Sequence, residues 1–202
     1  MRRAFFACYE KDDSLVRIAR LLYNYGWSLM GTVGTARFLN ENGVPCRDVS
    51  QIIGPMMLRH RIVTLDRKIF AGLLAKSDED ITELHTLGIL PIDLVYIRLF
   101  PIQKTIANPR AGVAEVAEDM DLGGPVILSA AVKGGRLALC DPNQIDDLES
   151  WLKQGGKKQD CEKLFFKFAA TATRYVADHI EMSAQYWERQ EAIHMGTSAK
   201  PE

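Results

Sequence analysis

A carboxylate and a lysine flank a glycine-rich stretch late in the chain. Asp121 precedes the sequence Leu-Gly-Gly-Pro, and Lys133 ends the apolar segment that follows it. A carboxylate and an ammonium around a backbone that a ligand can approach closely are suited to proton transfer and to the stabilisation of an anion. Both residues also have structural interpretations, because Asp121 can cap a helix N-terminus and Lys133 can be a favourable cation near a helix C-terminus. Local sequence alone favours these structural interpretations.

The sequence Gly-Thr-Val-Gly-Thr at residues 31–35 is the second candidate site. Its backbone N–H groups, its two hydroxyls and the start of a following helix suit a phosphate monoester. Lys11 and Arg61 would supply the countercharge that a bound phosphate needs. A short glycine motif is also an ordinary turn, and single basic residues are more often solvated surface residues. The motif therefore indicates a phosphate site without establishing one.

Composition limits the classes of function. The chain has 202 residues, of which 47% are hydrophobic and 25% are charged, and its formal net charge is −1. That length fits one domain, or one domain with an appendage. The charge gives no general affinity for nucleic acid or for an acidic membrane surface, so an anionic ligand must be held by local groups.

The cysteines and histidines do not have the spacing of a metal site. Four cysteines lie far apart without a Cys-x-x-Cys pair, and the four histidines show no ligand spacing. This pattern is typical of isolated thiols in a reducing compartment. The apolar run at residues 4–9 is too short for a signal peptide, and charges and prolines interrupt the stretch at residues 87–102. We predict a cytoplasmic protein with no metal site and no membrane or nucleic-acid partner.

Strand and helix patterns alternate through the first three quarters of the chain. Apolar runs predict strands within residues 2–9, 27–30, 92–100 and 136–140, and amphipathic patterns predict helices within residues 12–26, 77–88, 111–120 and 143–155. A loop at residues 31–35 leads into a short helix, and a Gly-Gly-Pro turn leads into the helix that ends near Lys133. This rhythm predicts an α/β fold in which helices cover a mainly parallel sheet.

The composition changes at residues 155–160, where a polar, glycine-containing linker is expected. Beyond it, apolar residues from Leu164 to Ile180 recur at helical spacing. They predict a long amphipathic helix that buries its stripe on the domain or on another subunit. The last residues, 195–202, are expected to form a frayed tail. We therefore divide the chain into a domain at residues 1–155 and a linker with a C-terminal helix at residues 156–202.

Five segments in unbroken order resemble the inosine monophosphate cyclohydrolase domain of the bifunctional purine biosynthesis protein. They are FFACYEK, GTVGTARFLNENGVPCRDVS, RIVTLDRKIFAGLLA, PIDLVYIRLFPIQKTIA and DMDLGGPVILSAAVKGG. The segment LFFKFAATATRYVADHI also looks like the helix that leads toward the transformylase half of that protein. The resemblance implies the methylglyoxal synthase-like fold, a three-layer α/β sandwich with a mainly parallel sheet, here followed by a C-terminal helical extension.

The resemblance also implies a ring closure. In that family, the carboxamide nitrogen of 5-formamidoimidazole-4-carboxamide ribotide attacks the formyl carbon, and water leaves to give inosine monophosphate (IMP). By resemblance, Lys133 carries out proton transfer and Asp121 positions the carboxamide, with no metal or organic cofactor. The expected partners are a second copy in a homodimer and a separate AICAR transformylase for formyl transfer.

The remaining substrate contacts implied by the resemblance lie in segments that follow the strands. They are Tyr9, Glu10, Lys11, Thr32, Val33, Gly34, Thr35, Arg61, Thr64, Ile97, Arg98, Leu122, Gly123 and Gly124. The chain departs from the family where Val63 replaces a lysine and Phe100 replaces a tyrosine. Each lost donor to an oxyanion costs on the order of 10²–10³ in rate. Alternatives are a purine-ribotide-binding pseudoenzyme that regulates a separate transformylase, or another lyase or synthase on the same fold.

Overall fold

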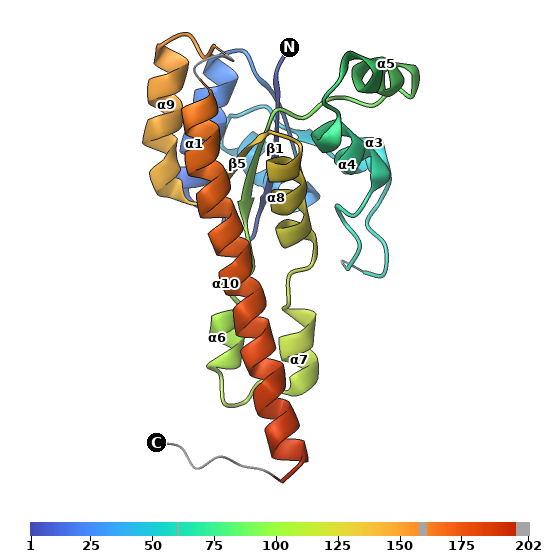
Figure 1. The fold of residues 1–202 in the computed structure, drawn as a ribbon, viewed down its shortest axis with the longest axis vertical. Coiled ribbons are helices and arrows are strands. Elements are labelled where there is room, and N and C mark those ends of the chain that lie inside the picture. The colour runs from blue at the N-terminus through green and yellow to red at the C-terminus, as the bar shows by residue number, and fades with distance from the viewer. Residues whose placement is uncertain (60, 158–160, 197–202) are drawn as a thin grey trace.

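A five-stranded sheet lies at the centre of the computed structural model, which describes residues 1–59, 61–157 and 161–196 (Figure 1). Its strands are β1 (Arg3–Cys8), β2 (Ser28–Gly31), β3 (Arg47–Asp48), β4 (Leu94–Arg98) and β5 (Leu137–Leu139). They lie in the order β3-β2-β1-β4-β5, and every neighbouring pair is parallel. The predicted α/β fold with a parallel sheet is confirmed, and the carboxyl ends of all five strands lie at one edge.

The two central strands are apolar on both faces, as parallel strands covered on both sides require. In β1, the side chains of Ala4 and Phe6 point to one face, and that of Phe5 points to the other. In β4, Tyr96 and Val95 divide between the same two faces. All five residues are fully buried, so the sheet separates two hydrophobic cores.

Helices cover both faces of the sheet and give the molecule three layers. The first core is covered by α1 (Asp13–Asn24), α2 (Val33–Glu41) and α9 (Ile145–Lys153). The second core is covered by α4 (Arg67–Leu74) and α8 (Gly123–Lys133). Each helix places an apolar stripe on the sheet, in keeping with the helical spacing of its apolar residues.

Shorter elements complete the fold. They are α3 (Ser50–Ile53), α5 (Asp78–Thr86), α6 (Ile102–Ile106), α7 (Val113–Glu118) and the 3₁₀ turn η1 (Pro142–Gln144). The predicted start of α5 is confirmed, because Ser77 and Asp80 form a capping box there. Helices α6 and α7 lie beyond the sheet, beside the lower half of the last helix (Figure 1).

The last helix, α10 (Glu162–His194), belongs to the same packed body. It runs along the edge strand β5 and then extends past the sheet to α6. Phe168 is fully buried in the first core and Ala172 in the second, and Tyr186 joins a small cluster with α6 and α7. The inner stripe of α10 is therefore buried on its own domain. None of the helices in the described parts of the chain is long and apolar enough to cross a membrane.

Two predictions about the local structure were wrong. The segment at residues 31–35 is not a loop, because α2 begins at Val33 and Gly34 has an ordinary helical conformation. Likewise, Gly123 begins α8 directly, so the Gly-Gly-Pro sequence is a first helical turn. Pro125 fits there because the N–H groups of a first turn have no partner within the helix. The expected linker and the expected tail fall partly outside the described residues.

Candidate functional site

The start of α2 is fixed to the end of β1 by a buried hydroxyl. Thr35 has no exposed surface, and its Oγ1 accepts the N–H of Cys8 at 3.2 Å. The Thr32 hydroxyl donates to the same oxygen at 3.0 Å. Thr35 therefore positions the first turn of α2 and is not itself open to a ligand. The half-buried Thr32 stands at the surface of that turn.

An ammonium group lies next to this helix start. Lys11 Nζ donates to the carbonyl oxygens of Cys8 at 2.9 Å and of Tyr9 at 3.1 Å. A Cβ atom added to Gly34 would lie 3.9 Å from the same Nζ, so the ammonium is beside the first turn of α2. A lysine and a helix N-terminus both favour an anion. The structure thus brings Lys11 together with the Thr32–Thr35 segment, two of the features that the sequence suggested for a phosphate site.

The start of α8 is packed tightly at the same edge of the sheet. A Cβ atom on Gly124 would overlap Leu99 just past β4, and a Cβ atom on Gly123 would lie 2.8 Å from Thr64 Oγ1. Asp121 Oδ1 accepts the N–H of Gly124 at 2.9 Å. This hydrogen bond supports the structural interpretation of Asp121 as a cap. It also places a carboxylate at the positive end of an eleven-residue helix.

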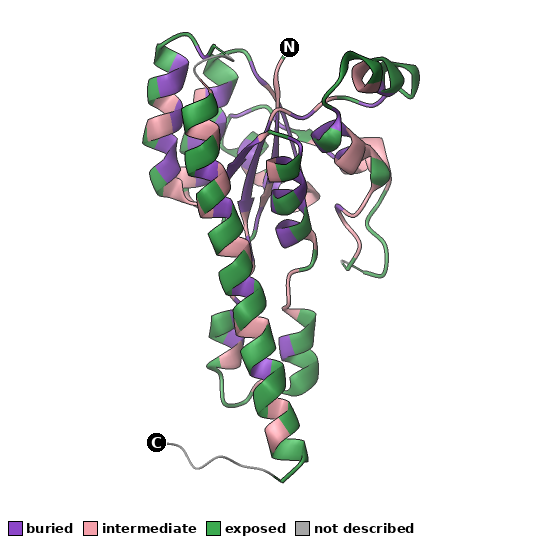
Figure 2. Cartoon of the chain, viewed as in Figure 1, coloured by how far each residue is buried: buried purple, intermediate pink, exposed green. Residues whose placement is uncertain are grey.

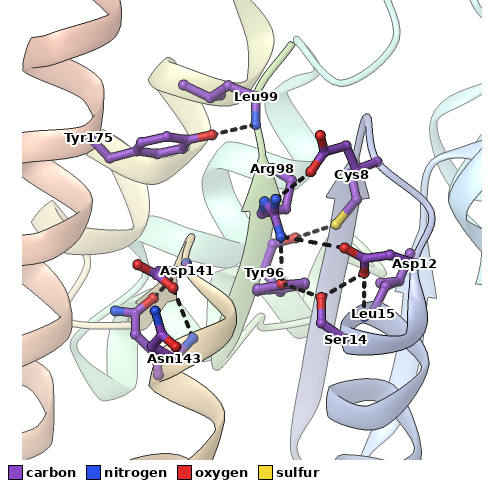
Figure 3. Close-up of polar contacts among 12 residues, drawn as sticks. Cys8, Asp12, Ser14, Leu15, Tyr96, Arg98, Leu99, Asp141, Asn143 and Tyr175 are labelled. Atoms are coloured by element: carbon purple, nitrogen blue, oxygen red, sulfur yellow. Dashed lines mark hydrogen bonds and ion pairs between the residues drawn. The ribbon is translucent and has the colours of Figure 1, made fainter. Parts of the chain in front are cut away.

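Arg98, at the end of β4, lies in a network of acidic and hydroxyl groups (Figure 3). Its Nη2 is 2.5 Å from Glu10 Oε2, and its Nη1 is 3.8 Å from Asp12 Oδ2 and 3.5 Å from Tyr96 Oη. Ser14 donates to Asp12 at 2.6 Å. The network joins the ends of β1 and β4 to the start of α1. Arg98 and Glu10, both expected from the resemblance to be substrate contacts, contact each other in the structure.

Asp12 and Tyr96, two titratable groups of this network, have shifted pKa values. Burial raises the pKa of Asp12, but hydrogen bonds from Ser14 and Leu15 and the charge of Arg98 outweigh it, so the pKa of Asp12 is lowered. Burial raises the pKa of Tyr96. Tyr96 is therefore a neutral hydrogen-bonding group near neutral pH, whereas Asp12 is an anion that balances Arg98.

The buried cysteines are unsuited to nucleophilic chemistry. Desolvation by burial raises the pKa of Cys8, of Cys46 and of Cys140 to about 12. A thiol becomes a nucleophile or a metal ligand as its thiolate, which is scarce at such a pKa. Within the described ranges, no group of histidine, cysteine and acidic residues has the geometry to hold a metal ion.

Other predicted site residues do not gather at the helix starts. Arg61 forms a two-pronged ion pair with Glu118 at the end of α7, with Nη2–Oε2 at 2.7 Å and Nε–Oε1 at 3.0 Å. Ile97 is 1% exposed and lies in the second core, so its side chain does not face a ligand. Leu122, in contrast, directly precedes Gly123 at the start of α8, and its side chain is 64% exposed.

Lys133 lies at the opposite end of α8 from Asp121. Ten residues separate it from Gly123, which corresponds to about 15 Å along a helix. Its side chain is exposed, and the neighbouring Gly134 packs against the backbone of Leu73. That end of α8 adjoins the amino-terminal edge of the sheet, where β5 begins. The structure therefore separates the two residues to which sequence analysis assigned the chemistry.

An aromatic pair stands at the carboxyl edge. The rings of Tyr9 and Phe100 meet edge to face with their centroids 4.4 Å apart. Tyr9 is 50% exposed, so its phenol is available at the edge where Phe100 has no hydroxyl. This arrangement joins the segments after β1 and β4.

Several residues at this edge were not predicted from the sequence. Asp12, Ser14 and Tyr96 surround Arg98, and the hydroxyl of Tyr175 on α10 accepts the N–H of Leu99 at 3.1 Å. Asp12 had a detectable signal, because it directly precedes an amphipathic helix and caps it through Leu15 N–H. The other contacts join distant segments and leave no local pattern.

Two hollows on the surface lie elsewhere. One is formed by α1 and α9 around Arg17, which pairs with Asp146 and Glu149. Another lies along the exposed side of α5. Neither hollow includes a strand end. We therefore place the candidate site at the carboxyl edge of the sheet, where ligands of open α/β folds bind.

Comparison with known proteins gives the family. The family model described as "MGS-like domain" matches residues 14–126, which include most of α1, all of β2, α2 and β4, and the start of α8. The chain belongs to the MGS-like domain family. The crystal structure of ForH superposes on it with a TM-score of 0.78 at 28% sequence identity, covering 92% of this chain and 98% of that one. The predicted fold family is therefore confirmed.

Several relatives in sequence are bifunctional purine biosynthesis proteins, PurH. The chain is 35% identical to PurH of Thermosynechococcus vestitus in an alignment 192 residues long, which covers 90% of this chain and 37% of that protein. It is 33% identical to PurH of Halalkalibacterium halodurans over 92% of this chain and 37% of that protein. The MGS-like chain thus spans little more than a third of the length of these relatives. The predicted resemblance to a domain of the bifunctional protein is confirmed.

Proposed function

We propose that this MGS-like chain is an IMP cyclohydrolase, which closes the ring of 5-formamidoimidazole-4-carboxamide ribotide to give IMP and water. The observation that carries the proposal is a pair of helix starts at one sheet edge, α2 beside Lys11 and α8 beside Asp121. One helix start suits a phosphate, and the other suits the polar groups of a heterocycle. The similarity to PurH relatives over most of the chain supports this substrate class.

The phosphate end of the site is assigned to α2. Lys11 and the N–H groups of the first turn of α2 bind the phosphate oxygens, and the hydroxyl of Thr32 adds a donor. Thr35 acts through position only, because its buried hydroxyl holds the turn against β1. Inosine, which lacks the phosphate, should therefore bind much more weakly than IMP.

The reacting end of the site is assigned to α8 and its surroundings. A C–N bond forms between the carboxamide nitrogen and the formyl carbon, and the formyl oxygen leaves as water with one proton from each of the two nitrogens. Holding both groups on one molecule supplies much of the acceleration, because the step is intramolecular. The positive end of α8 stabilises the oxyanion, and Asp121 accepts an N–H of the carboxamide. Thr64 and the phenol of Tyr9 are further donors at this edge.

The proposal is tested by a spectrophotometric ring-closure assay with parallel thermal unfolding. We expect turnover above the uncatalysed rate, and a rise in Tm with IMP that inosine does not reproduce. Ring closure no faster than the uncatalysed rate would contradict the proposed cyclohydrolase activity. Equal effects of IMP and inosine on Tm would contradict the phosphate site.

A ribotide-binding pseudoenzyme is the second candidate. The observation in its favour is the pair Val63 and Phe100, which offers apolar side chains where the resemblance leads one to expect an ammonium and a phenol. A rise in Tm with IMP without any turnover would support this alternative. Formyl transfer by a separate AICAR transformylase stays a prediction under both readings.

A further inference from the structure

The outer face of α10 carries an exposed stripe that the domain does not cover. The stripe consists of Phe166, Ala170, Thr173, Ala177, Ile180 and Ala184, and it ends at Trp187. These positions alternate in steps of four and three residues, which is the spacing of a coiled-coil seam. All seven side chains are exposed, and the three large ones, Phe166, Ile180 and Trp187, are 61%, 54% and 42% exposed. Figure 2 shows the outward face of α10 exposed along most of its length.

The stripe is distinct from the face that holds α10 on its domain. The buried residues Phe168, Ala172, His179 and Tyr186 lie on the other side of the helix. From Phe166 to Trp187 the stripe extends over about 32 Å. A helix that serves only its own domain needs one apolar stripe, and α10 has two. The second stripe is therefore a candidate surface for binding another molecule.

The charges beside the stripe identify the occupant as a second copy of the chain. The residues that flank one side at seven-residue spacing are Lys167, Arg174, Glu181 and Glu188, and all four are exposed. The first two are basic and the last two are acidic. An antiparallel copy of this helix places Lys167 opposite Glu188 and Arg174 opposite Glu181, twice each by symmetry. When two copies of this helix run in opposite directions, opposite charges therefore face each other, as a symmetric (isologous) interface requires.

A parallel pairing does not use these charges. In parallel coiled coils, this flank faces the other flank of the partner helix. Here the other flank consists of Ala169, Val176, Ser183 and Gln190, which carry no charge. In the antiparallel arrangement the small side chains of Ala170, Ala177 and Ala184 let the two helices approach closely.

Two of the flanking side chains already have contacts within the chain, and both remain compatible with a partner. Lys167 Nζ lies 2.6 Å from Asp147 Oδ2, yet its side chain is 60% exposed. An ammonium has three donors, so it can contact a second carboxylate. Glu181 accepts one hydrogen bond from Gln185 at Oε1, at 2.8 Å. A carboxylate has a second oxygen for an arginine.

We infer that α10 pairs with α10 of a second copy as an antiparallel coiled coil along this stripe. The two-fold axis passes beside Ala177 and Ile180, near the middle of the seam. The pairing buries Phe166 and Trp187 against the opposite ends of the partner helix. This pairing specifies the interface of the homodimer expected from the sequence, the antiparallel direction of its two helices and their register.

Charge reversal tests the pairing, with sedimentation velocity or light scattering as the readout. The wild type should have twice the chain mass of 22.7 kDa. Arg174→Glu and Glu181→Arg should each weaken the dimer at least about tenfold, because each single variant opposes like charges at two places. The double variant should restore the dimer. Glu83→Arg, an exposed charge reversal on α5, serves as the matched control and should remain dimeric.

Cysteine cross-linking tests the direction independently. Ala177→Cys lies next to the two-fold axis and should form an intermolecular disulfide on mild oxidation. Ala170→Cys should not, because antiparallel helices place the two copies of residue 170 far apart, at about 25 Å. A monomeric wild type would overturn the inference. So would a dimer that the charge reversals leave intact, or efficient cross-linking through residue 170.

Discussion

Arg98 is held by groups from three directions at the carboxyl edge of the sheet. Glu10 and Asp12 follow β1, and Tyr96 lies two residues before Arg98 on β4. The guanidinium is only 19% exposed, so its charge is balanced mainly by the protein. A substrate that contacts Arg98 must share it with these carboxylates. Its role at this edge is thus also structural, because it joins two strands to α1.

The lowered pKa of Asp12 predicts a specific acid dependence of stability. A carboxyl whose pKa is lower in the folded state stabilises the fold above its unfolded pKa, near 3.8, and this contribution is lost as the pH falls through the folded value. We expect Asp12→Asn to lower stability at pH 7 and to flatten the loss of stability below about pH 4. Asparagine still caps α1, so the helix start is kept. Urea unfolding at several pH values measures the effect.

The control for this experiment is Asp13→Asn. Asp13 is exposed and lies in the first turn of α1, so the substitution changes the same charge on the same helix without touching Arg98. An equal pH dependence in both variants would show that the Arg98 network does not carry the effect.

Asp121 and Lys133 differ in their expected effect on ring closure. Because Asp121 lies at the start of α8 and Lys133 about 15 Å away at its end, only Asp121 is in position to contact the substrate. Asp121→Ala should lower kcat by about 10²–10³, the scale of a lost group that stabilises the transition state. Lys133→Ala should lower kcat by less than about tenfold. Steady-state kinetics and circular dichroism of both variants give the comparison.

Equal losses of kcat in the two variants with intact folding would return Lys133 to the proton-transfer role that the resemblance implies. Such a result would require α8 or its surroundings to rearrange when the substrate binds. An unchanged kcat in Asp121→Ala would leave this carboxylate with only its capping role toward Gly124.

At the scale of elements, the alternation of strands and helices was predictable, and the starts of α2 and α8 were not. The apolar runs around Phe5 and Val95 and the amphipathic pattern of α1 are local signals, so the alternation that specifies a parallel sheet could be recognised. Gly34 and Gly123 were predicted to lie in a loop and in a turn, but both lie in the first turn of a helix. A glycine marks a turn in some contexts and close packing in others, and Gly123 is required here by its contact with Thr64.

The candidate site was predictable only in part, for a related reason. The segment around Thr32 carries a recognisable local motif, and the structure places Lys11 beside it. The ion pair of Arg61 with Glu118 and the network around Arg98 join residues far apart in the sequence, so no local pattern indicates them. In α10 the periodicity was clear, but residues of two stripes on opposite sides of the helix alternate along the sequence, and only packing shows which one faces the domain.

The connection between α8 and β5 depends on a second close contact. A Cβ atom on Gly134 would overlap the backbone carbonyl of Leu73, which cannot move as a side chain does. Arg136 Nε also donates to this carbonyl, at 2.9 Å. Gly134→Ala should therefore destabilise the fold by about 1–3 kcal/mol, the usual cost of overpacking. Ala130→Gly, at a nearby buried position of α8, would test instead the cost of lost helix propensity, about 1 kcal/mol.

Thermal and urea unfolding measure both variants. The Gly134→Ala variant should lose stability while the sheet remains folded. A variant as stable as the wild type would show that the α8–β5 connection can move away from α4, and that the close approach is not required.

At the scale of the whole molecule, α10 packs into the domain at residues 1–155, although the sequence suggested that residues 156–202 form a separate segment. Phe168 lies in the core on one face of the sheet and Ala172 in the core on the other, while the helix passes along the edge strand β5. Tyr175 adds a hydrogen bond to Leu99 beside the candidate site. Covering an edge strand also removes a template for aggregation. The independence of residues 1–155 as a domain stays a prediction, and this packing argues against it.

Truncation after residue 155 tests that independence. Removing α10 uncovers both cores and the edge of β5, and the loss of a buried phenylalanine such as Phe168 alone costs about 3–5 kcal/mol. Total stabilities are only about 5–15 kcal/mol, so we expect the truncated chain to aggregate or to lose cooperative unfolding. Phe168→Ala in the full chain should lose about 3–5 kcal/mol, whereas Phe166→Ala, on the exposed stripe, should change the stability of the monomer by less than about 0.5 kcal/mol. Urea unfolding at low protein concentration separates these effects from dimerisation. A soluble truncated chain with a cooperative transition and unchanged IMP binding would show that α10 serves only the interface between copies.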